Sequence, residues 1–171
     1  MKYFRKKRFL IFLAAFALLL GWLWWGNNAL SVEEYTFSSP RLPNGWDGAR
    51  IVHLSDLHGK EFGVDNVRLL GAVRDADPEL IVITGDIADA ESGLAMLPPL
   101  LQGLTEIAPT YYISGNHEWG AGFIGELREM LEASSVTYLR NEALPLTRSG
   151  DTIVLAGIED PNGYADQKTP A

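Results

Sequence analysis

Side chains able to bind metal ions follow three apolar runs of this chain. Asp56 and His58 follow the first run, Asp86 follows the second, and Asn116 and His117 follow the third. Asp56, Asp86 and Asn116 are spaced thirty residues apart, about the length of one strand-helix unit. Because parallel strands end at a common edge, we expect these side chains at the carboxyl edge of one sheet, where ligands bind. The residue types predict a metal-dependent hydrolase of phosphate esters.

The spacing also suggests a role for each side chain. In an extended segment Asp56 and His58 would point to the same side and bind one ion, preferably Mn, Fe or Zn rather than Ca. The Asp86 carboxylate could bridge this ion to a second divalent ion, to which Asn116 would offer its amide oxygen. His117 would then face the substrate, where it could protonate the leaving alkoxide or stabilise developing charge.

Each of these residues taken alone has an ordinary structural explanation. An Asp at a strand-helix turn is most often a helix N-cap, and Asn116 could be a turn residue. His53 has the opposite parity inside its strand, so we expect a core histidine there. Glu118 and Asp89 are predicted to be supporting or capping groups. The whole set, in this order at strand ends, is what favours a metal site.

The elements that must position these residues alternate between strand and helix, which predicts an α/β fold with a mostly parallel sheet. The Gly-rich run at 120–125 fits G-x-G-x-x-G but does not directly follow its strand, which argues against a dinucleotide site. The expected strands cover 50–55, 80–84, 110–114 and 136–139, with a hairpin of 143–147 and 152–158, and the expected helices cover 64–76, 89–106 in pieces around Pro98-Pro99, and 124–133.

The amino-terminal segment predicts a single-pass signal-anchor. Residues 9–26 are uncharged and apolar, and as a helix they would span roughly 27 Å, close to the thickness of a bilayer core. Five basic residues precede this run, so residues 1–8 are expected in the cytoplasm and the remainder outside the cell membrane. A cleaved signal peptide is one alternative. It is disfavoured because Asn27 stands where a cleavage site needs a small residue before Ala29. A buried helix of a soluble protein is the other alternative.

The composition of the remaining chain limits its organisation and its partners. Residues 27–45 are polar and are predicted to form a tether, and residues 46–171 are predicted to form the domain. Beyond residue 8 the chain has 9 basic and 22 acidic residues, a net charge of −13, so we expect no nucleic acid partner. Because the chain has no cysteine, disulfides, thiolate zinc sites and a cysteine nucleophile are excluded.

The motif set resembles that of the calcineurin-like metallophosphoesterase superfamily. A short D-L-H motif after a membrane anchor is similar to the membrane-associated bacterial branch, some of whose members act on lipid-linked phosphodiesters. In this sequence the motifs are Asp56-x-His58, Gly85-Asp86-x-x-Asp89 and Gly115-Asn116-His117-Glu118.

The resemblance implies a four-layer αββα sandwich around two divalent metal ions. By the family pattern Asp56 and His58 bind the first ion, Asp86 bridges, Asn116 binds the second, and His117 is the transition-state histidine. The pattern also has metal-binding histidines further downstream, which this sequence does not contain. We therefore expect the amino-terminal part of the sandwich, in a chain that is incomplete.

The expected function is hydrolysis of phosphomonoesters or phosphodiesters by a metal-activated water, at the outer face of the membrane. Lipid-linked or envelope-derived phosphoesters are the candidate substrates, because the chain is membrane-anchored. The alternative is a non-catalytic metal-binding or interaction domain that needs a partner chain.

Overall fold

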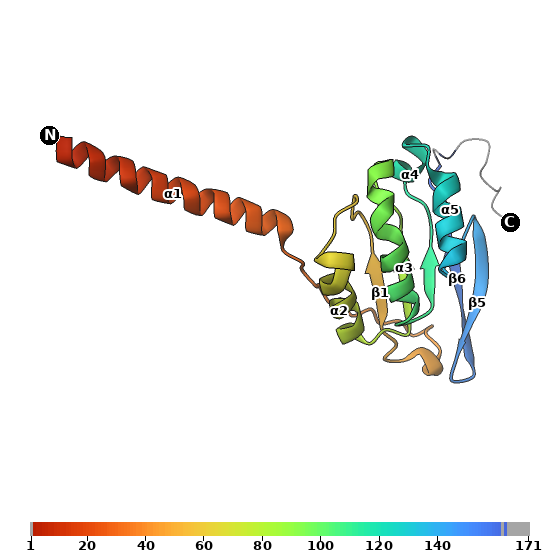
Figure 1. Ribbon diagram of the computed structural model, residues 1–171. Coiled ribbons are helices and arrows are strands. Elements are labelled where there is room, and N and C mark those ends of the chain that lie inside the picture. The colour runs from red at the N-terminus through yellow and green to blue at the C-terminus, as the bar shows by residue number, and fades with distance from the viewer. Residues whose placement is uncertain (1, 162, 164–171) are drawn as a thin grey trace. The chain divides into compact units, whose positions relative to one another are not determined.

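The computed structural model describes residues 2–161 and residue 163, so the end of the predicted domain lies outside the described residues. The chain divides into two compact units, residues 1–33 and residues 34–171. The first unit consists largely of α1 (Lys2–Asn28), drawn in red and orange in Figure 1. Its segment Arg5–Asn28 is long and apolar enough to cross a membrane. This one helix includes the predicted anchor together with described residues of the basic segment and the first residues of the predicted tether.

The second unit is built on a parallel sheet in which the strands follow the order of the sequence. Leu54 is paired with Ile83, and Ile83 with Tyr112, so the carboxyl ends of the first three strands are aligned. The sheet contains β1 (Ile51–Leu54), β2 (Leu80–Ile83), β3 (Thr110–Tyr112) and β4 (Thr137–Tyr138). The prediction of an α/β fold with a parallel sheet is confirmed.

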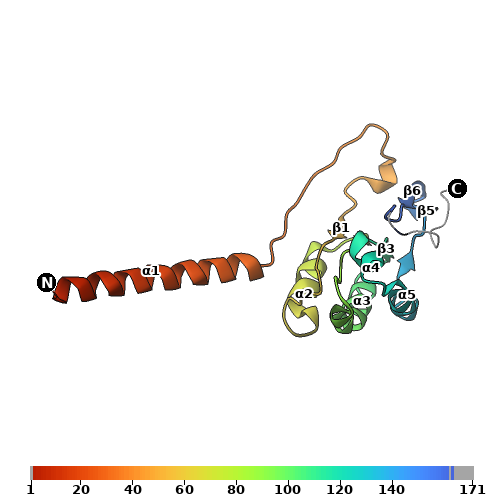
Figure 2. The same cartoon turned by 90° about the horizontal axis from the view of Figure 1, so that it is seen from above.

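Three helices lie side by side along one face of this sheet, as Figure 2 shows from above. They are α2 (Val67–Ala76), α3 (Leu97–Thr105) and α5 (Ile124–Ala133). Each presents leucine or valine side chains at helical spacing that are buried, and the central strand β2 is apolar along its whole length. These side chains form the core.

In the part of the chain that the structure describes, the remaining elements are a hairpin, one short helix and three 3₁₀ turns. The predicted hairpin is present as the antiparallel strands β5 (Glu142–Arg148) and β6 (Asp151–Gly157), which form a separate sheet. The helix α4 (Asn116–Gly120) was not predicted. The other elements of the described residues are three 3₁₀ turns, η1 (Asn44–Trp46), η2 (Val64–Asn66) and η3 (Glu91–Met96).

Two local predictions need correction. Pro98 and Pro99 do not interrupt a helix, because the break falls between η3 and α3, and the prolines lie in the first turn of α3, where proline is tolerated. His53 is not a core residue. It is exposed on the same side of β1 as the exposed Ile51, and its Nε2 lies 2.7 Å from the Thr84 hydroxyl. The alternation of side chains along β1 places His53 and Ile51 on one face of the sheet, but the helices cover the other face.

The segment that leads into the domain is fastened to the hairpin turn. The Trp46 side chain is buried and donates from Nε1 to the Asp151 carbonyl at 3.1 Å, while the Gly45 amide donates to the Asp151 carboxylate at 2.7 Å. Arg148 donates to the Gly45 carbonyl and to Glu79 Oε1 at 2.6 Å. We call these five residues the tether clamp. Since Glu79 directly precedes β2, the clamp lies at the amino edge of the parallel sheet.

Candidate metal centre

The loops that leave β1 and β2 run side by side beyond the strand ends. The amides of Asp56, His58 and Gly59 donate to carbonyls of the second loop, at Gly85 (3.2 Å), Asp86 (3.0 Å) and Ile87 (2.7 Å). Asp56, His58 and Asp86 all have positive φ, between 51° and 57°. The backbone there is therefore left-handed. The prediction from the sequence had assumed an extended segment, and that assumption is wrong. Left-handed backbone at non-glycine residues is uncommon and concentrates at functional sites.

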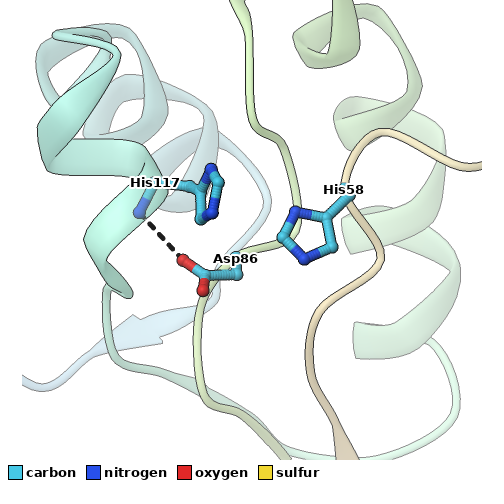
Figure 3. Close-up of side chains that lie close together, drawn as sticks. All are labelled: His58, Asp86 and His117. Carbon is cyan, nitrogen blue, oxygen red and sulfur yellow. Dashed lines mark hydrogen bonds between the residues drawn. The ribbon is translucent and has the colours of Figure 1, made fainter.

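Three side chains, two from loops and one from the first turn of α4, meet at this edge of the sheet. Figure 3 shows His58, Asp86 and His117 close together, and one ligand atom of each lies within 4.8 Å of the others. The two imidazole rings have centroids 4.8 Å apart and cross at 81°. We call these residues the metal cluster. Asp56 lies beside it, with Oδ1 3.7 Å from His58 Nε2.

The donor set of this cluster fits a divalent ion. Imidazole nitrogens and carboxylate oxygens suit Zn, Mn or Fe, whose bonds to them are about 2.1 Å long. Donor atoms around one ion are then roughly 3–4 Å apart, so only small side-chain movements would bring the cluster onto an ion. One ligand atom of His117 lies within 4.8 Å of one of Asp86. Asn116, the first residue of α4, is exposed, and its role as a ligand remains a prediction.

Two glycines allow the second and third loops to touch. Gly85 has φ +81°, and a Cβ placed on it would lie 2.0 Å from the Gly115 amide nitrogen. A Cβ on Gly115 would lie 2.2 Å from Asp86 Oδ1. The left-handed backbone of Gly85 is one reason for glycine there, and the close approach of the two loops is a second.

Asp86 also holds the start of α4. The N-cap of this helix is Gly115, which has no side chain to accept a bond from the first turn. Asp86 Oδ1, from the neighbouring loop, accepts the hydrogen bond of the His117 amide at 2.9 Å (Figure 3). The carboxylate of the metal cluster is thus oriented by a backbone group of the helix that carries His117.

A second carboxylate, that of the buried Glu118, is bonded to the same two loops. Glu118 is 1% exposed. It accepts hydrogen bonds from the amides of Asp86 (3.0 Å), Ile87 (2.9 Å) and Gly115 (2.9 Å) and from the Tyr112 hydroxyl (2.8 Å). The predicted supporting role of Glu118 is confirmed.

Tyr112 is a site residue that the sequence did not indicate. It is the last residue of β3 and is buried, so its alternation along the strand marked only a core position. Burial, followed by the negative charge of Glu118, raises the pKa of Tyr112 well above the ordinary value. Tyr112 therefore stays protonated and acts as a donor to Glu118.

Comparisons with known proteins show what this chain is similar to. The model of the family described as calcineurin-like phosphoesterase matches residues 49–169. The chain is 29% identical over 137 residues to "Uncharacterized metallophosphoesterase YkuE" of Bacillus subtilis, covering 77% of this chain and 48% of that protein.

It is also similar to proteins named "Transmembrane protein with metallophosphoesterase domain". The one from Danio rerio is 30% identical over 128 residues, and the one from Bos taurus 31% over 130 residues. Each match covers 70% of this chain and 29% of the relative. The chain thus spans about half the length, or less, of these relatives.

Proposed function

Because this chain belongs to the calcineurin-like phosphoesterase family, we propose that its metal cluster is part of a two-metal site for the hydrolysis of phosphomonoesters or phosphodiesters. Family membership supports the reaction class, metal-dependent hydrolysis of phosphate esters. The observation that carries the proposal is the convergence of His58, Asp86 and His117 from three strand ends. When bound, two divalent ions would supply an activated water and neutralise the phosphate oxygens.

The protein residues have separate tasks in this proposal. Asp56 and His58 would hold the first ion, and Asn116 would hold the second. Asp86 would bind both, in the orientation fixed by its bond from the His117 amide. The His117 imidazole would donate a proton to the leaving alkoxide. A histidine that acts as a general acid contributes roughly 10²–10⁴-fold to the rate of such a step.

The proposed setting is the outer face of the cell membrane. The helix α1 and the relatives named as transmembrane proteins support membrane association. The basic residues before the apolar run favour a cytoplasmic amino terminus, which leaves the domain outside. Lipid-linked or envelope-derived phosphoesters are the proposed substrates. Resistance of the full-length protein to alkaline carbonate extraction tests the anchor, and release of the domain would favour cleavage.

One observation keeps a second function open. The sequence contains three histidines, one of which, His53, lies within β1 rather than in the metal cluster. Within the described part of the chain, the proposed protein ligands of a second ion are Asp86 and Asn116. The alternative is a metal-binding or interaction domain that does not turn over substrate unless a partner chain completes it.

The deciding experiment is hydrolysis of bis-p-nitrophenyl phosphate and p-nitrophenyl phosphate by the full chain in detergent, after removal and return of Mn²⁺, Zn²⁺, Fe²⁺ or Mg²⁺. We expect turnover that depends on metal and that falls by about two orders of magnitude or more in Asp86→Asn and His117→Gln. The matched control is Asp77→Asn, an exposed aspartate paired with Arg50 at the amino edge of the sheet, which should retain activity. Metal binding without turnover would favour the alternative.

A further inference from the structure

Glu118 connects the two loops from which Asp86 and His117 extend. We propose that Glu118, supported by Tyr112, is a positioning residue of the metal centre, which sets the affinity for metal by fixing the distance between these loops. The inference rests on the proposed metal site but concerns residues outside the predicted ligand set. Glu118 was expected only to be a supporting or capping group, and the structure gives it a specific task.

The first argument is the set of groups that Glu118 joins. Two of its donors, the amides of Asp86 and Ile87, belong to the loop after β2. The third, the amide of Gly115, belongs to the loop after β3. A single buried carboxylate therefore spans two loops that are about thirty residues apart in the sequence. Bonds to a charged acceptor are roughly twice as strong as neutral ones, which favours a fixed separation.

The second argument is that the two loops hold each other reciprocally. Glu118 accepts the amide of Asp86, and the Asp86 carboxylate accepts the amide of His117, the residue before Glu118. Gly85 and Gly115 bring the backbones so close that a Cβ on either would overlap the other loop. Movement of either loop would break bonds on both sides, so the carboxylate of Asp86 and the backbone of His117 move together or not at all.

The third argument is that only a carboxylate satisfies this position. Each oxygen of Glu118 accepts two bonds: Oε1 from Ile87 and the Tyr112 hydroxyl, and Oε2 from the amides of Asp86 and Gly115. In Glu118→Gln one oxygen becomes an NH₂ group, whichever way the amide is turned. At the Oε2 position the NH₂ group would face two backbone amides. At the Oε1 position it could donate to the Tyr112 hydroxyl, which can also accept, but it would still face the Ile87 amide. At least one buried amide would therefore lack an acceptor, which is costly.

The chain offers a matched control for a purely structural effect. Glu159, which follows β6, is also buried and also accepts a tyrosine hydroxyl, that of Tyr138, at 2.7 Å. It also accepts from Arg140 Nε at 3.3 Å, a side-chain donor rather than an amide of the metal-binding loops. Glu159→Gln therefore tests the loss of a buried negative charge, because its amide oxygen can still accept both bonds that Glu159 Oε1 accepts. Glu118→Gln removes the same charge at the metal centre and also an acceptor of its loop amides.

The experiment is titration of the full chain in detergent with Mn²⁺ by calorimetry, together with amide hydrogen exchange without metal. In Glu118→Gln we expect the Kd for Mn²⁺ to rise about 10- to 100-fold, as for other residues that orient metal ligands. The amides of Asp86, Ile87 and Gly115 should exchange faster. Tyr112→Phe should weaken binding in the same direction but less, because one of four donors is lost. Glu159→Gln should bind Mn²⁺ as the unaltered protein does.

The outcomes are distinguishable. If the unaltered protein binds Mn²⁺ and a folded Glu118→Gln variant binds it equally well, the inference is overturned while the proposed function stands. Equal weakening in Glu159→Gln would also overturn it, because the effect would then be general. If the unaltered protein binds none of the metals, both proposals fail. Should Glu118→Gln not fold, Tyr112→Phe decides: unchanged affinity in that variant overturns the inference.

Discussion

At the scale of single residues, the metal centre depends on two glycines as much as on its metal-binding side chains. Gly85 and Gly115 meet where Asp86 turns toward α4, and neither position has room for a Cβ. This contact brings the Asp86 carboxylate within reach of the His117 amide. The glycines of the two motifs are thus part of the geometry that orients the proposed bridging ligand.

We expect Gly115→Ala to separate the two loops. The new Cβ would lie 2.2 Å from Asp86 Oδ1 and 2.8 Å from the Asp86 backbone nitrogen, which cannot move alone. Overpacking of this kind costs roughly 1–3 kcal/mol in the free energy of unfolding, and Mn²⁺ binding should weaken with it. Urea denaturation and calorimetry measure both quantities.

The control is Gly125→Ala in α5, where a Cβ would meet nothing within 4 Å. This variant should gain about 0.5–1 kcal/mol, because alanine favours a helix over glycine. A Gly115→Ala protein as stable as Gly125→Ala, with unchanged metal binding, would contradict the close contact of the loops.

The buried tyrosines predict a fall in stability at alkaline pH. Burial is the main reason that the pKa values of Tyr112 and Tyr138 are raised in the folded state. Above pH about 10 the unfolded chain loses these protons and the folded chain keeps them. The contribution of these two tyrosines to the free energy of unfolding should therefore be constant below pH about 10 and decrease above it, by about 1.4 kcal/mol per pH unit for each tyrosine.

Denaturation of the unaltered protein and of Tyr112→Phe between pH 8 and pH 11 measures this slope. The variant should show a smaller decrease, since one of the two groups is gone. Equal slopes in both proteins would mean that Tyr112 ionises as readily in the folded chain as in the unfolded one.

At the scale of elements, apolar periodicity determined most of the fold. The helix α5 has the predicted bounds, and the strands β1, β2 and β3 lie inside the predicted ranges. The helix α4 is only five residues long, and one of its capping groups, Asp86, lies in another loop and is not visible as a local sequence signal. The bond from the Gly115 amide to Glu118 is local, but the bonds of Glu118 to the loop after β2 are not.

The helix layer predicts one strong effect on stability. Leu101 of α3 is fully buried, so Leu101→Ala should lower the free energy of unfolding by about 2–5 kcal/mol. The side chain of its exposed neighbour Gln102 donates to Glu106, one helical turn further along, so Gln102→Ala should change the free energy of unfolding by about 0.5 kcal/mol or less. Urea denaturation compares the two, and similar losses would place Leu101 outside the core.

At the scale of the whole molecule, the sequence predicted a membrane helix followed by an α/β domain. The structure has an α/β domain and an amino-terminal helix long and apolar enough to cross a membrane. The sequence could not indicate which face of the sheet is covered, and His53 was misplaced for that reason. Nor could it indicate that Asp56 and His58 come together through left-handed backbone, because parity applies only to extended segments.

The absence of cysteine in the sequence allows a clean test of membrane orientation. With Glu126→Cys, an exposed position of α5, we expect a membrane-impermeant maleimide to label intact cells, because the domain is proposed to lie outside. Lys6→Cys should be labelled only after permeabilisation. The reverse pattern would contradict the proposed outer location, whatever the activity of the domain.

The tether clamp has a mechanical consequence for a protein held in a membrane. Tension along residues 29–43 would reach the domain at Gly45 and Trp46, which are bonded to Asp151 and Arg148 before the chain arrives at β1. Arg148 passes that load to Glu79 at the amino edge of the sheet. The loops with His58, Asp86 and His117 leave the opposite edge, outside the load path. Such a domain can be pulled and turned by its tether while the spacing of its metal-binding loops stays unchanged.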